Sequence, residues 1–209
     1  MVLLDSEGEM SNPIDFYFDY SSPYGYIAAT KIDELAAKYG RGVNWKPILL
    51  GVVFKVTGAQ PLPSLPLKGD YAKHDIARSA RFHGIAIRQP SKFPIASQAP
   101  SRAFYWVNER DPALARRLAK ALYQAFFVDD RDISSPNVTA DVASTLGLNR
   151  DEVLAAINNP AIKDKLKNET EAAIKRGVFG SPYIVIDGEP FWGVDRFDQI
   201  EHWLAKGPF

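Results

Sequence analysis

The first strongly apolar segment of the chain, Ile14–Asp19, combines isoleucine, phenylalanine and tyrosine in the way typical of a parallel strand buried on both faces. A helix should follow from Ser22 to about Tyr39, because a capping serine and a proline precede apolar residues at three- and four-residue spacings. Val43–Leu50 is a second buried strand. We therefore predict a βαβ unit with parallel strands and a right-handed crossover.

The middle of the chain changes character twice. Between residues 51 and 66 proline, glycine and small residues predict a loop, and a loop of this length is more often functional than idle. Helical patterns then follow one another, and the aromatic side chains within them are expected to be mainly core. The expected helices are Tyr71–Phe82, Gln98–Asn108, Pro112–Phe127, Pro136–Thr145, Arg150–Asn158 and Ile162–Lys175.

Strand patterns return near the C-terminus. Tyr183–Ile186 and Glu189–Trp192 flank an Asp-Gly turn, and an amphipathic helix follows from Val194 to Leu204. The order βαβ, helices, ββα predicts an α/β fold in which one mixed sheet carries a large all-helical insertion.

We divide the chain accordingly. The expected parts are a flexible N-terminal tail at residues 1–12, a sheet domain at 13–69 and 177–209, and a helical insertion at 70–176; translation could start at Met1 or at Met10.

Charge and composition exclude several classes of function. Lysine plus arginine and aspartate plus glutamate number 25 each, so the chain lacks the basic excess of a nucleic-acid binder. No apolar run is long enough for a membrane helix and no signal sequence is recognisable, which predicts a cytoplasmic protein without a membrane partner. Three scattered histidines predict no metal site. Without cysteine, any thiol chemistry must use the sulfur of another molecule.

Two short motifs carry candidate chemistry. Ser22 lies where a strand ends and a helix begins, a position that favours an anion such as a thiolate, although a serine there can also be only a helix cap. No GxSxG motif accompanies it, which argues against a hydrolase triad. Pro182, after Ser181, enters a strand and can be a cis-proline whose exposed backbone pairs with a peptide-like ligand, or an ordinary trans turn.

The ordered combination of these motifs resembles a known family. Phe16–Asp19, Ser22–Gly25, Val178–Pro182 and Trp192–Arg196 together resemble the 2-hydroxychromene-2-carboxylate isomerases and the kappa-class glutathione transferases. These enzymes form part of the DsbA-like branch of the thioredoxin fold, and the resemblance extends from Ile14 to Leu204. Where oxidoreductases of this fold have a CxxC motif, this chain has none, which excludes a disulfide oxidoreductase.

The resemblance implies glutathione as the cofactor, with Ser22 donating a hydrogen bond to its thiolate. It also implies that the Ser181 backbone, next to a cis-Pro182, pairs with the cysteinyl unit, and that Lys68 lies near the glycyl carboxylate. The γ-glutamyl end would be held by Trp192, Gly193, Val194 and Asp195. An aromatic small-molecule substrate is expected beside Tyr24, Phe54 and Phe93, and related proteins are commonly homodimers.

Some positions depart from the family pattern. Ala59 stands where an asparagine is usual, and Gly25 replaces a serine. Phe54, Leu65 and Phe93 match positions at which the isomerases hold their keto acid with basic and phenolic groups; Lys55, Arg88 and Lys92 are the charges nearby in sequence. The leading prediction is a glutathione-dependent cis–trans isomerase acting on an aromatic 2-oxo acid. A kappa-like glutathione transferase and a non-catalytic binding protein are the alternatives.

Overall fold

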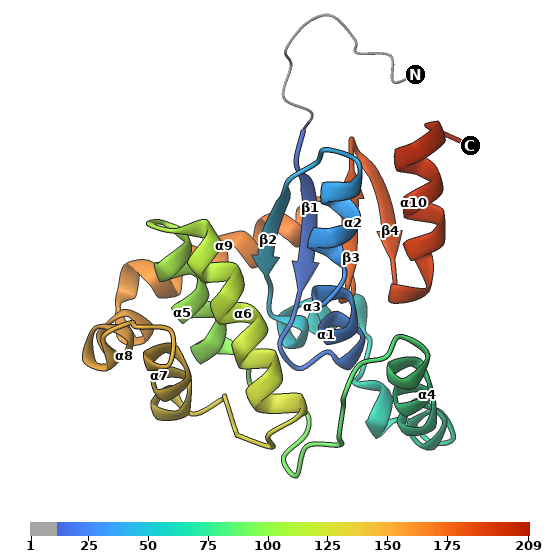
Figure 1. The fold of residues 1–209 in the computed structure, drawn as a ribbon. Coiled ribbons are helices and arrows are strands. Elements are labelled where there is room, and N and C mark those ends of the chain that lie inside the picture. Colours follow the sequence, from blue (N-terminus) through green and yellow to red (C-terminus); the bar gives the residue numbers. More distant parts are fainter. Residues whose placement is uncertain (1–11) are drawn as a thin grey trace, which may run out of the picture.

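A mixed sheet formed by the two ends of the chain organises the computed structural model, which describes residues 12–209. The strand order is β2-β1-β3-β4 (Figure 1). Strands β1 (Ile14–Phe18) and β2 (Val43–Pro47) are parallel, whereas β3 (Tyr183–Ile186) runs antiparallel to β1 and to β4 (Glu189–Trp192). The predicted mixed sheet is therefore confirmed.

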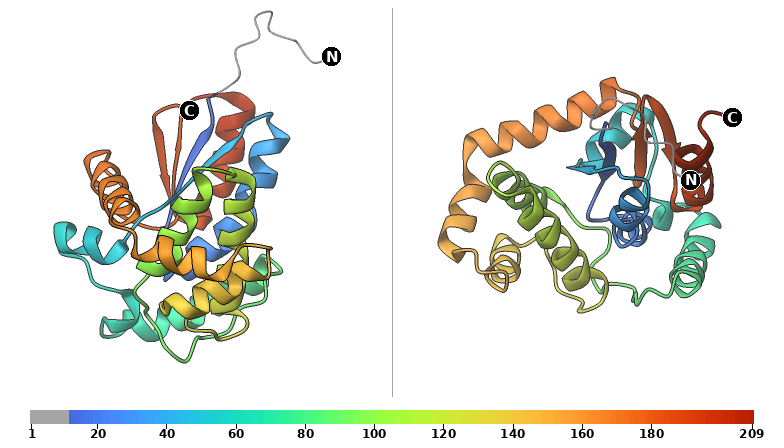
Figure 2. Two further views of the ribbon diagram at one scale, coloured as in Figure 1. Left: turned by 90° about the vertical axis from the view of Figure 1, so that its left-hand side faces the viewer. Right: turned by 45° about the horizontal axis from the view of Figure 1, so that its top comes forward.

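Helices cover both faces of this sheet (Figure 2). They are α1 (Pro23–Ala29), α2 (Ile32–Lys38), α3 (Leu50–Thr57), α4 (Lys68–Phe82), α5 (Gln98–Asn108), α6 (Pro112–Phe127), α7 (Pro136–Ser144), α8 (Arg150–Asn158), α9 (Pro160–Lys175) and α10 (Phe197–Lys206). Short 3₁₀ turns at Leu62–Ser64 and Val194–Arg196 precede α4 and α10. The predicted tail at residues 1–12 lies almost wholly outside the described residues.

The arrangement of the helices determines where a site can form. Helices α5 to α9 lie together on the β2 side of the molecule, whereas α4 lies on the opposite side of α1 (Figures 1 and 2). The start of α1 lies at the end of the sheet where β1 and β2 terminate (Figure 1). Helix α1 therefore has the helical block on one side and α4 on the other.

Strand β1 is buried on both faces, as its sequence predicts. Phe16 and Phe18 belong to the larger core, which also contains the apolar sides of α1, α2, α5 and α6. Tyr17 points to the other face and joins a smaller cluster with Val53 of α3 and Ala173 of α9.

The expectation that the aromatic residues of the insertion are mainly core is confirmed as well. Phe104, Tyr105, Tyr123, Phe126 and Phe127 are buried, and Trp106 packs against this core.

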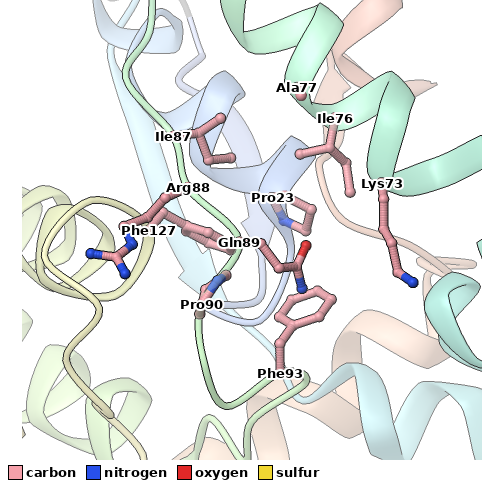
Figure 3. A pocket seen from close by; sticks show the side chains of 10 residues that line it. All are labelled: Pro23, Lys73, Ile76, Ala77, Ile87, Arg88, Gln89, Pro90, Phe93 and Phe127. Carbon is pink, nitrogen blue, oxygen red and sulfur yellow. The ribbon is translucent and has the colours of Figure 1, made fainter. Parts of the chain in front are cut away.

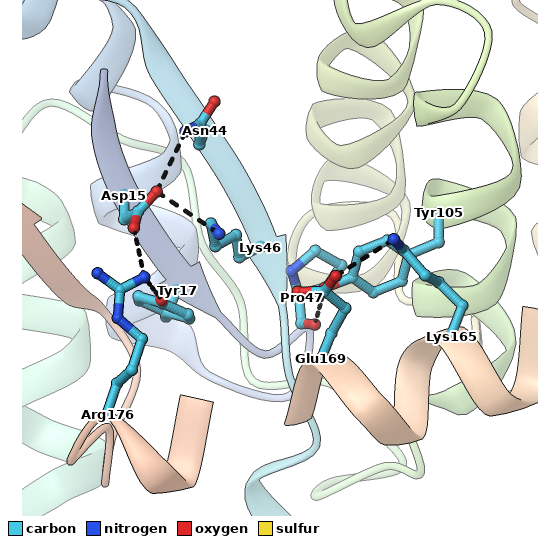
Figure 4. A network of polar contacts seen from close by, with 9 residues as sticks. All are labelled: Asp15, Tyr17, Asn44, Lys46, Pro47, Tyr105, Lys165, Glu169 and Arg176. Carbon is cyan, nitrogen blue, oxygen red and sulfur yellow. Dashed lines mark hydrogen bonds and ion pairs between the residues drawn. The ribbon is translucent and has the colours of Figure 1, made fainter. Parts of the chain in front are cut away.

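Polar contacts fix α9 and α5 to the sheet (Figure 4). Arg176, just after α9, donates to Asp15 at 2.9 Å and to the Tyr17 hydroxyl at 3.0 Å. The buried Tyr105 hydroxyl of α5 donates to the carbonyl oxygen of Pro47 at 2.8 Å. These contacts hold the helical block against β1 and β2, whose ends form the site.

The prediction of one continuous helix from Ser22 to Tyr39 was wrong. Helix α1 ends at Ala29, and α2 begins only at Ile32. The Thr30 hydroxyl donates to the carbonyl oxygen of Ile27 at 2.7 Å, a side-chain bond that competes with regular helical hydrogen bonding. Because α1 has only seven residues, its dipole contributes less to anion binding than a long helix would.

The predicted loop at residues 51–66 and the end of the second strand also need correction. Strand β2 stops at Pro47, three residues before the predicted end, and residues 50–57 form α3. Leu50 and Val53 bury one side of this helix, which ends at Gly58 with a positive φ of 73°. Glycine adopts that conformation without steric cost, so it terminates the helix readily.

Candidate active site

Ser22 occupies the turn between β1 and α1, and the predicted helix cap is confirmed. Its Oγ accepts a hydrogen bond from the Gly25 N–H at 3.0 Å, and its own N–H donates to the Asp19 carbonyl oxygen at 2.9 Å. The residue is 6% exposed. The first turn of α1 therefore holds this hydroxyl in a defined place at the end of the sheet.

Ser181 lies directly opposite and contacts this turn twice. Its carbonyl oxygen accepts from the Ser22 hydroxyl at 2.8 Å, and its own hydroxyl accepts from the Asp19 N–H at 2.9 Å. The Ser181–Pro182 peptide bond is cis, as the family resemblance implied. Segments separated by about 160 positions in the sequence thus meet at one point.

A buried carboxylate that the sequence analysis did not single out underlies this turn. Asp19 Oδ1 accepts from the N–H and hydroxyl of Ser21, both at 2.7 Å. Its Oδ2 accepts from the Leu50 N–H at 2.7 Å and from the Ser97 hydroxyl at 2.9 Å. Burial raises the pKa of the Asp19 carboxyl, although these hydrogen bonds act in the opposite direction. An acidic residue ending an otherwise apolar strand was the signal available in the sequence.

The predicted γ-glutamyl residues lie beside Ser181. Trp192 pairs with Tyr183 across β3 and β4, and the Gly193 N–H donates to the Pro182 carbonyl oxygen at 3.1 Å. Gly193 has a φ of 109°, a conformation that favours glycine. The buried Val194 begins the following turn, and the Asp195 side chain is exposed. The structure thus brings Ser22, the Ser181 edge and residues 192–195 to the same end of the sheet.

An apolar pocket of about 160 Å³ opens next to α1 (Figure 3). Pro23, the residue after Ser22, forms part of its wall, together with Phe93 and the end of α6 at Phe127. Its lining comprises Pro23, Lys73, Ile76, Ala77, Ile87, Arg88, Gln89, Pro90, Phe93 and Phe127. A cavity of about 150 Å³ can hold benzene, so this pocket has room for one six-membered ring.

The charged groups around this pocket are already paired. Lys73 contacts Asp70 at 3.2 Å, and Arg88 contacts Asp130 at 3.2 Å. In Figure 3 the Arg88 guanidinium points away from the pocket, whereas the Gln89 amide points toward Pro23 and Phe93. The sequence analysis had named Arg88 but missed Lys73 and Gln89, because α4 and the segment before α5 meet only in the folded chain.

The other charges named in the sequence lie away from the pocket. Lys92 binds Asp132 at 2.7 Å, and Lys55 is exposed on α3. Lys68 begins α4, is exposed and forms no ion pair within residues 12–209. Neither Lys55 nor Lys92 therefore supplies charge to this cavity.

The predicted substrate residues separate in the structure. Phe93 lines the pocket, but Phe54 packs on the opposite side of the sheet against the smaller core cluster. Tyr24 is not among the lining residues; its hydroxyl donates to Asp75 of α4 at 2.6 Å. This bond is the main cause of the lowered pKa of Asp75, while burial raises the pKa of Tyr24. Tyr24 thus joins α1 to α4, which forms one wall of the pocket.

Among residues 12–209, no helix is long and apolar enough to cross a membrane. The same residues contain no cluster of three histidine, aspartate or glutamate side chains placed to hold a metal ion.

Comparison with known proteins agrees with this geometry. The model of the DSBA-like thioredoxin domain matches residues 13–205. A 2-hydroxychromene-2-carboxylate isomerase of Pseudomonas putida is 30% identical over 92% of this chain and 94% of its own length. Glutathione S-transferase kappa 2 of Caenorhabditis elegans is 28% identical over 93% of this chain and 94% of its own length.

Solved structures show the same relationship. A 2-hydroxychromene-2-carboxylate isomerase structure superposes with a TM-score of 0.84 at 28% identity, covering 92% of this chain and 94% of that one. The chain therefore belongs to the DSBA-like thioredoxin domain family, where its relatives are enzymes of the 2-hydroxychromene-2-carboxylate isomerase and kappa glutathione transferase type.

Proposed function

We propose that this protein is a glutathione-dependent cis–trans isomerase of the 2-hydroxychromene-2-carboxylate type, acting on an aromatic 2-oxo acid. The observation that carries the proposal is the position of the Ser22 hydroxyl, which contacts the Ser181 carbonyl beside a pocket sized for one ring. Relatives that cover nearly the whole chain are named for this reaction or for glutathione transfer.

The backbone at Ser181 supports the choice of glutathione. The Ser181 N–H donates to no acceptor within residues 12–209, and its carbonyl oxygen is shared only with the Ser22 hydroxyl. An extended cysteinyl unit can pair with such an edge as an added strand. The exposed Lys68 and Asp195 side chains supply a cation and an anion that suit the glycyl carboxylate and the γ-glutamyl ammonium.

Ser22 would then act as the hydrogen-bond donor. A hydroxyl has one proton, which in the unliganded site is directed at Ser181. When a ligand amide takes that carbonyl, the Ser22 hydroxyl is released to donate to sulfur while it still accepts from Gly25. A hydrogen bond donated to the thiolate stabilises this charged form and so lowers the pKa of the thiol. Bound glutathione supplies the thiolate that adds to the conjugated substrate and leaves again.

The apolar pocket would position the second reactant. Pro23 and Phe93 give it flat apolar walls one residue from Ser22, so a bound ring lies close to the donor. Holding two reactants in contact can contribute several kcal/mol to a bimolecular step, of the order of 7 kcal/mol in favourable cases.

The test is a titration of bound glutathione. We expect the ultraviolet absorbance of its thiolate to appear at lower pH on the native protein than in solution, and Ser22→Ala to remove most of that shift. Ser64→Ala, at an exposed serine in the turn before α4, is the control. No glutathione binding at millimolar concentration would contradict both enzymatic readings and leave a binding protein.

One observation favours the transferase as second candidate. The cations that line the pocket are paired with Asp70 and Asp130, which suits an uncharged acceptor better than a carboxylate. Incubation with 2-hydroxychromene-2-carboxylate and limiting glutathione separates the two. An isomerase turns over many substrates for each glutathione and leaves it unchanged, whereas a transferase consumes one glutathione for each acceptor molecule.

A further inference from the structure

The side chain and the backbone of Ser181 have different hydrogen-bond partners in this site. Strands β1 and β3 are paired with Tyr17 opposite Tyr183, and continuing this register brings Asp19 opposite Ser181. The Pro182 carbonyl oxygen accepts a hydrogen bond from the Gly193 N–H, which lies on the side of β4. Because successive residues of a strand direct their backbone groups to opposite neighbours, those of Ser181 face β1. A regular ladder would therefore pair the Asp19 N–H with the Ser181 carbonyl oxygen.

The observed pairing differs from that ladder. The Asp19 N–H donates to the Ser181 hydroxyl at 2.9 Å, and the Ser181 carbonyl accepts from the Ser22 hydroxyl at 2.8 Å. The side chain thus replaces the backbone as the acceptor for Asp19. This exchange leaves the carbonyl for Ser22, and both bonds are buried.

Gly25 provides the space in which the Ser181 hydroxyl sits. A Cβ atom on Gly25 would lie 2.6 Å from Ser181 Oγ, 2.9 Å from Tyr123 Oη and 3.1 Å from Ser22 Cβ. The first two of these distances are shorter than any normal contact of a Cβ atom. Consequently a side chain at position 25 would force the Ser181 and Tyr123 hydroxyls to move, and the Ser181 hydroxyl most.

We propose that the Ser181 hydroxyl is a positioning residue that clamps the Asp19–Ser22 turn and so directs the Ser22 hydroxyl, with Gly25 leaving the room it needs. The Asp19 N–H and the Ser22 Oγ–H are the two groups held, and Asp19 also accepts the Ser22 N–H through its carbonyl oxygen. The clamp itself is independent of any ligand, whereas its effect on a thiolate rests on the proposed function.

The first experiment uses the unliganded protein. Ser181→Ala should speed amide hydrogen exchange at Asp19 about tenfold, because the Ser181 hydroxyl that accepts from this N–H is lost. It should also average the Ser22 χ1 couplings in the NMR spectrum. Ser97→Ala is the matched control, since it removes another buried hydroxyl that contacts Asp19 through the carboxylate. Equal exchange rates at Asp19 in the two variants would overturn the clamp.

The second experiment tests the shared space. Gly25→Ala should destabilise the native protein. Part of that loss should disappear in the Gly25→Ala/Ser181→Ala double variant, where the 2.6 Å contact no longer exists although the 2.9 Å contact to Tyr123 Oη remains. Additive losses in urea denaturation would contradict the steric conflict between these two positions.

The third experiment links the clamp to chemistry. In Ser181→Ala the pH profile of bound glutathione thiolate should move toward that of free glutathione, while glutathione affinity measured below the thiol pKa changes less than about threefold, because the backbone edge remains. A lower stability with an unchanged pH profile would mean a purely structural role and would overturn the proposal. If the native protein binds no glutathione, the proposed function fails, and the exchange data alone decide the clamp.

Discussion

The two halves of the candidate site are built in opposite ways. The polar half, formed by Asp19, Ser22 and Ser181, is buried and joined by direct hydrogen bonds between β1, α1 and the start of β3. The pocket half consists of α4 and the segment before α5, and exposed side chains such as Lys73 and Gln89 make up part of it. The polar half is therefore fixed to the sheet, whereas the pocket half lies at the periphery of the molecule.

Individual hydrogen bonds attach the pocket half to α1, to the end of α6 and to the segment after it. The Arg88 N–H donates to the Phe127 carbonyl oxygen at 2.8 Å, and Ser91 contacts the Asp130 carboxylate through its N–H and its hydroxyl. Helix α4 is linked to α1 by the hydrogen bond from Tyr24 to Asp75. Under the proposed function, we therefore expect the polar half, which would hold the sulfur, to stay constant while the pocket half accommodates different substrates.

The largest expected effect is on the polar half. Asp19→Ala removes the acceptor of four hydrogen bonds and leaves the buried Leu50 N–H and Ser97 hydroxyl without a partner. We expect a loss of about 3 kcal/mol in the free energy of unfolding, measured by urea denaturation. Asp19→Asn keeps the shape and one acceptor oxygen, so it should lose less. Equal stability of Asp19→Ala and the native protein would show that the turn does not depend on this carboxylate.

Much of the polar half could be predicted because its signals are local. A serine cap and a following proline are read from adjacent residues, and the structure confirms the cap at Ser22. The local sequence left the bond before Pro182 open between cis and trans; the family resemblance implied the cis form, which the structure shows. The partners of Asp19 could not be predicted, since Leu50, Ser97 and Ser181 come from separate segments of the chain. The register of β1 against β3 places Ser181 beside Asp19.

The errors in the fold have physical causes as well. Helix α3 was missed because Gly51 and the nearby prolines indicated a loop, while the buried pair Leu50 and Val53 is too short a periodic signal. The break after Ala29 depends on the Thr30 hydroxyl bonding backward to Ile27. Phe54 and Phe93 looked equivalent in the sequence, but the sheet places them on different sides.

The second largest effect should be confined to the pocket half. Phe93→Ala removes an aromatic wall, and we expect the KM for the aromatic acceptor to rise about tenfold while the pH profile of bound glutathione stays unchanged. Phe54→Ala is the matched variant, because Phe54 lies outside the pocket and should leave this KM unaltered. An equal rise in both variants would mean that the acceptor does not bind in this cavity.

A smaller effect is expected where the two halves meet. Tyr24→Phe removes the 2.6 Å hydrogen bond to Asp75 and should cost about 1 kcal/mol in the free energy of unfolding. The KM for the acceptor should rise as α4 loses its link to α1. Tyr39→Phe, which removes a tyrosine bond to Glu201 far from the pocket, is the control for the KM measurement. If the two variants have the same KM, the link does not position the pocket wall.

The smallest effect is the pH dependence of that link. The Tyr24 hydroxyl is the main cause of the lowered pKa of Asp75 in the folded protein, with Arg78 acting in the same direction. A folded pKa below the unfolded value stabilises the protein above the unfolded pKa, near 3.8, and this contribution is lost as the pH falls through the folded pKa. The difference in unfolding free energy between the native protein and Tyr24→Phe should therefore be constant near neutral pH and shrink below about pH 4. A difference that stays constant throughout the acid range would show that Tyr24 contributes through packing and not through the Asp75 carboxylate.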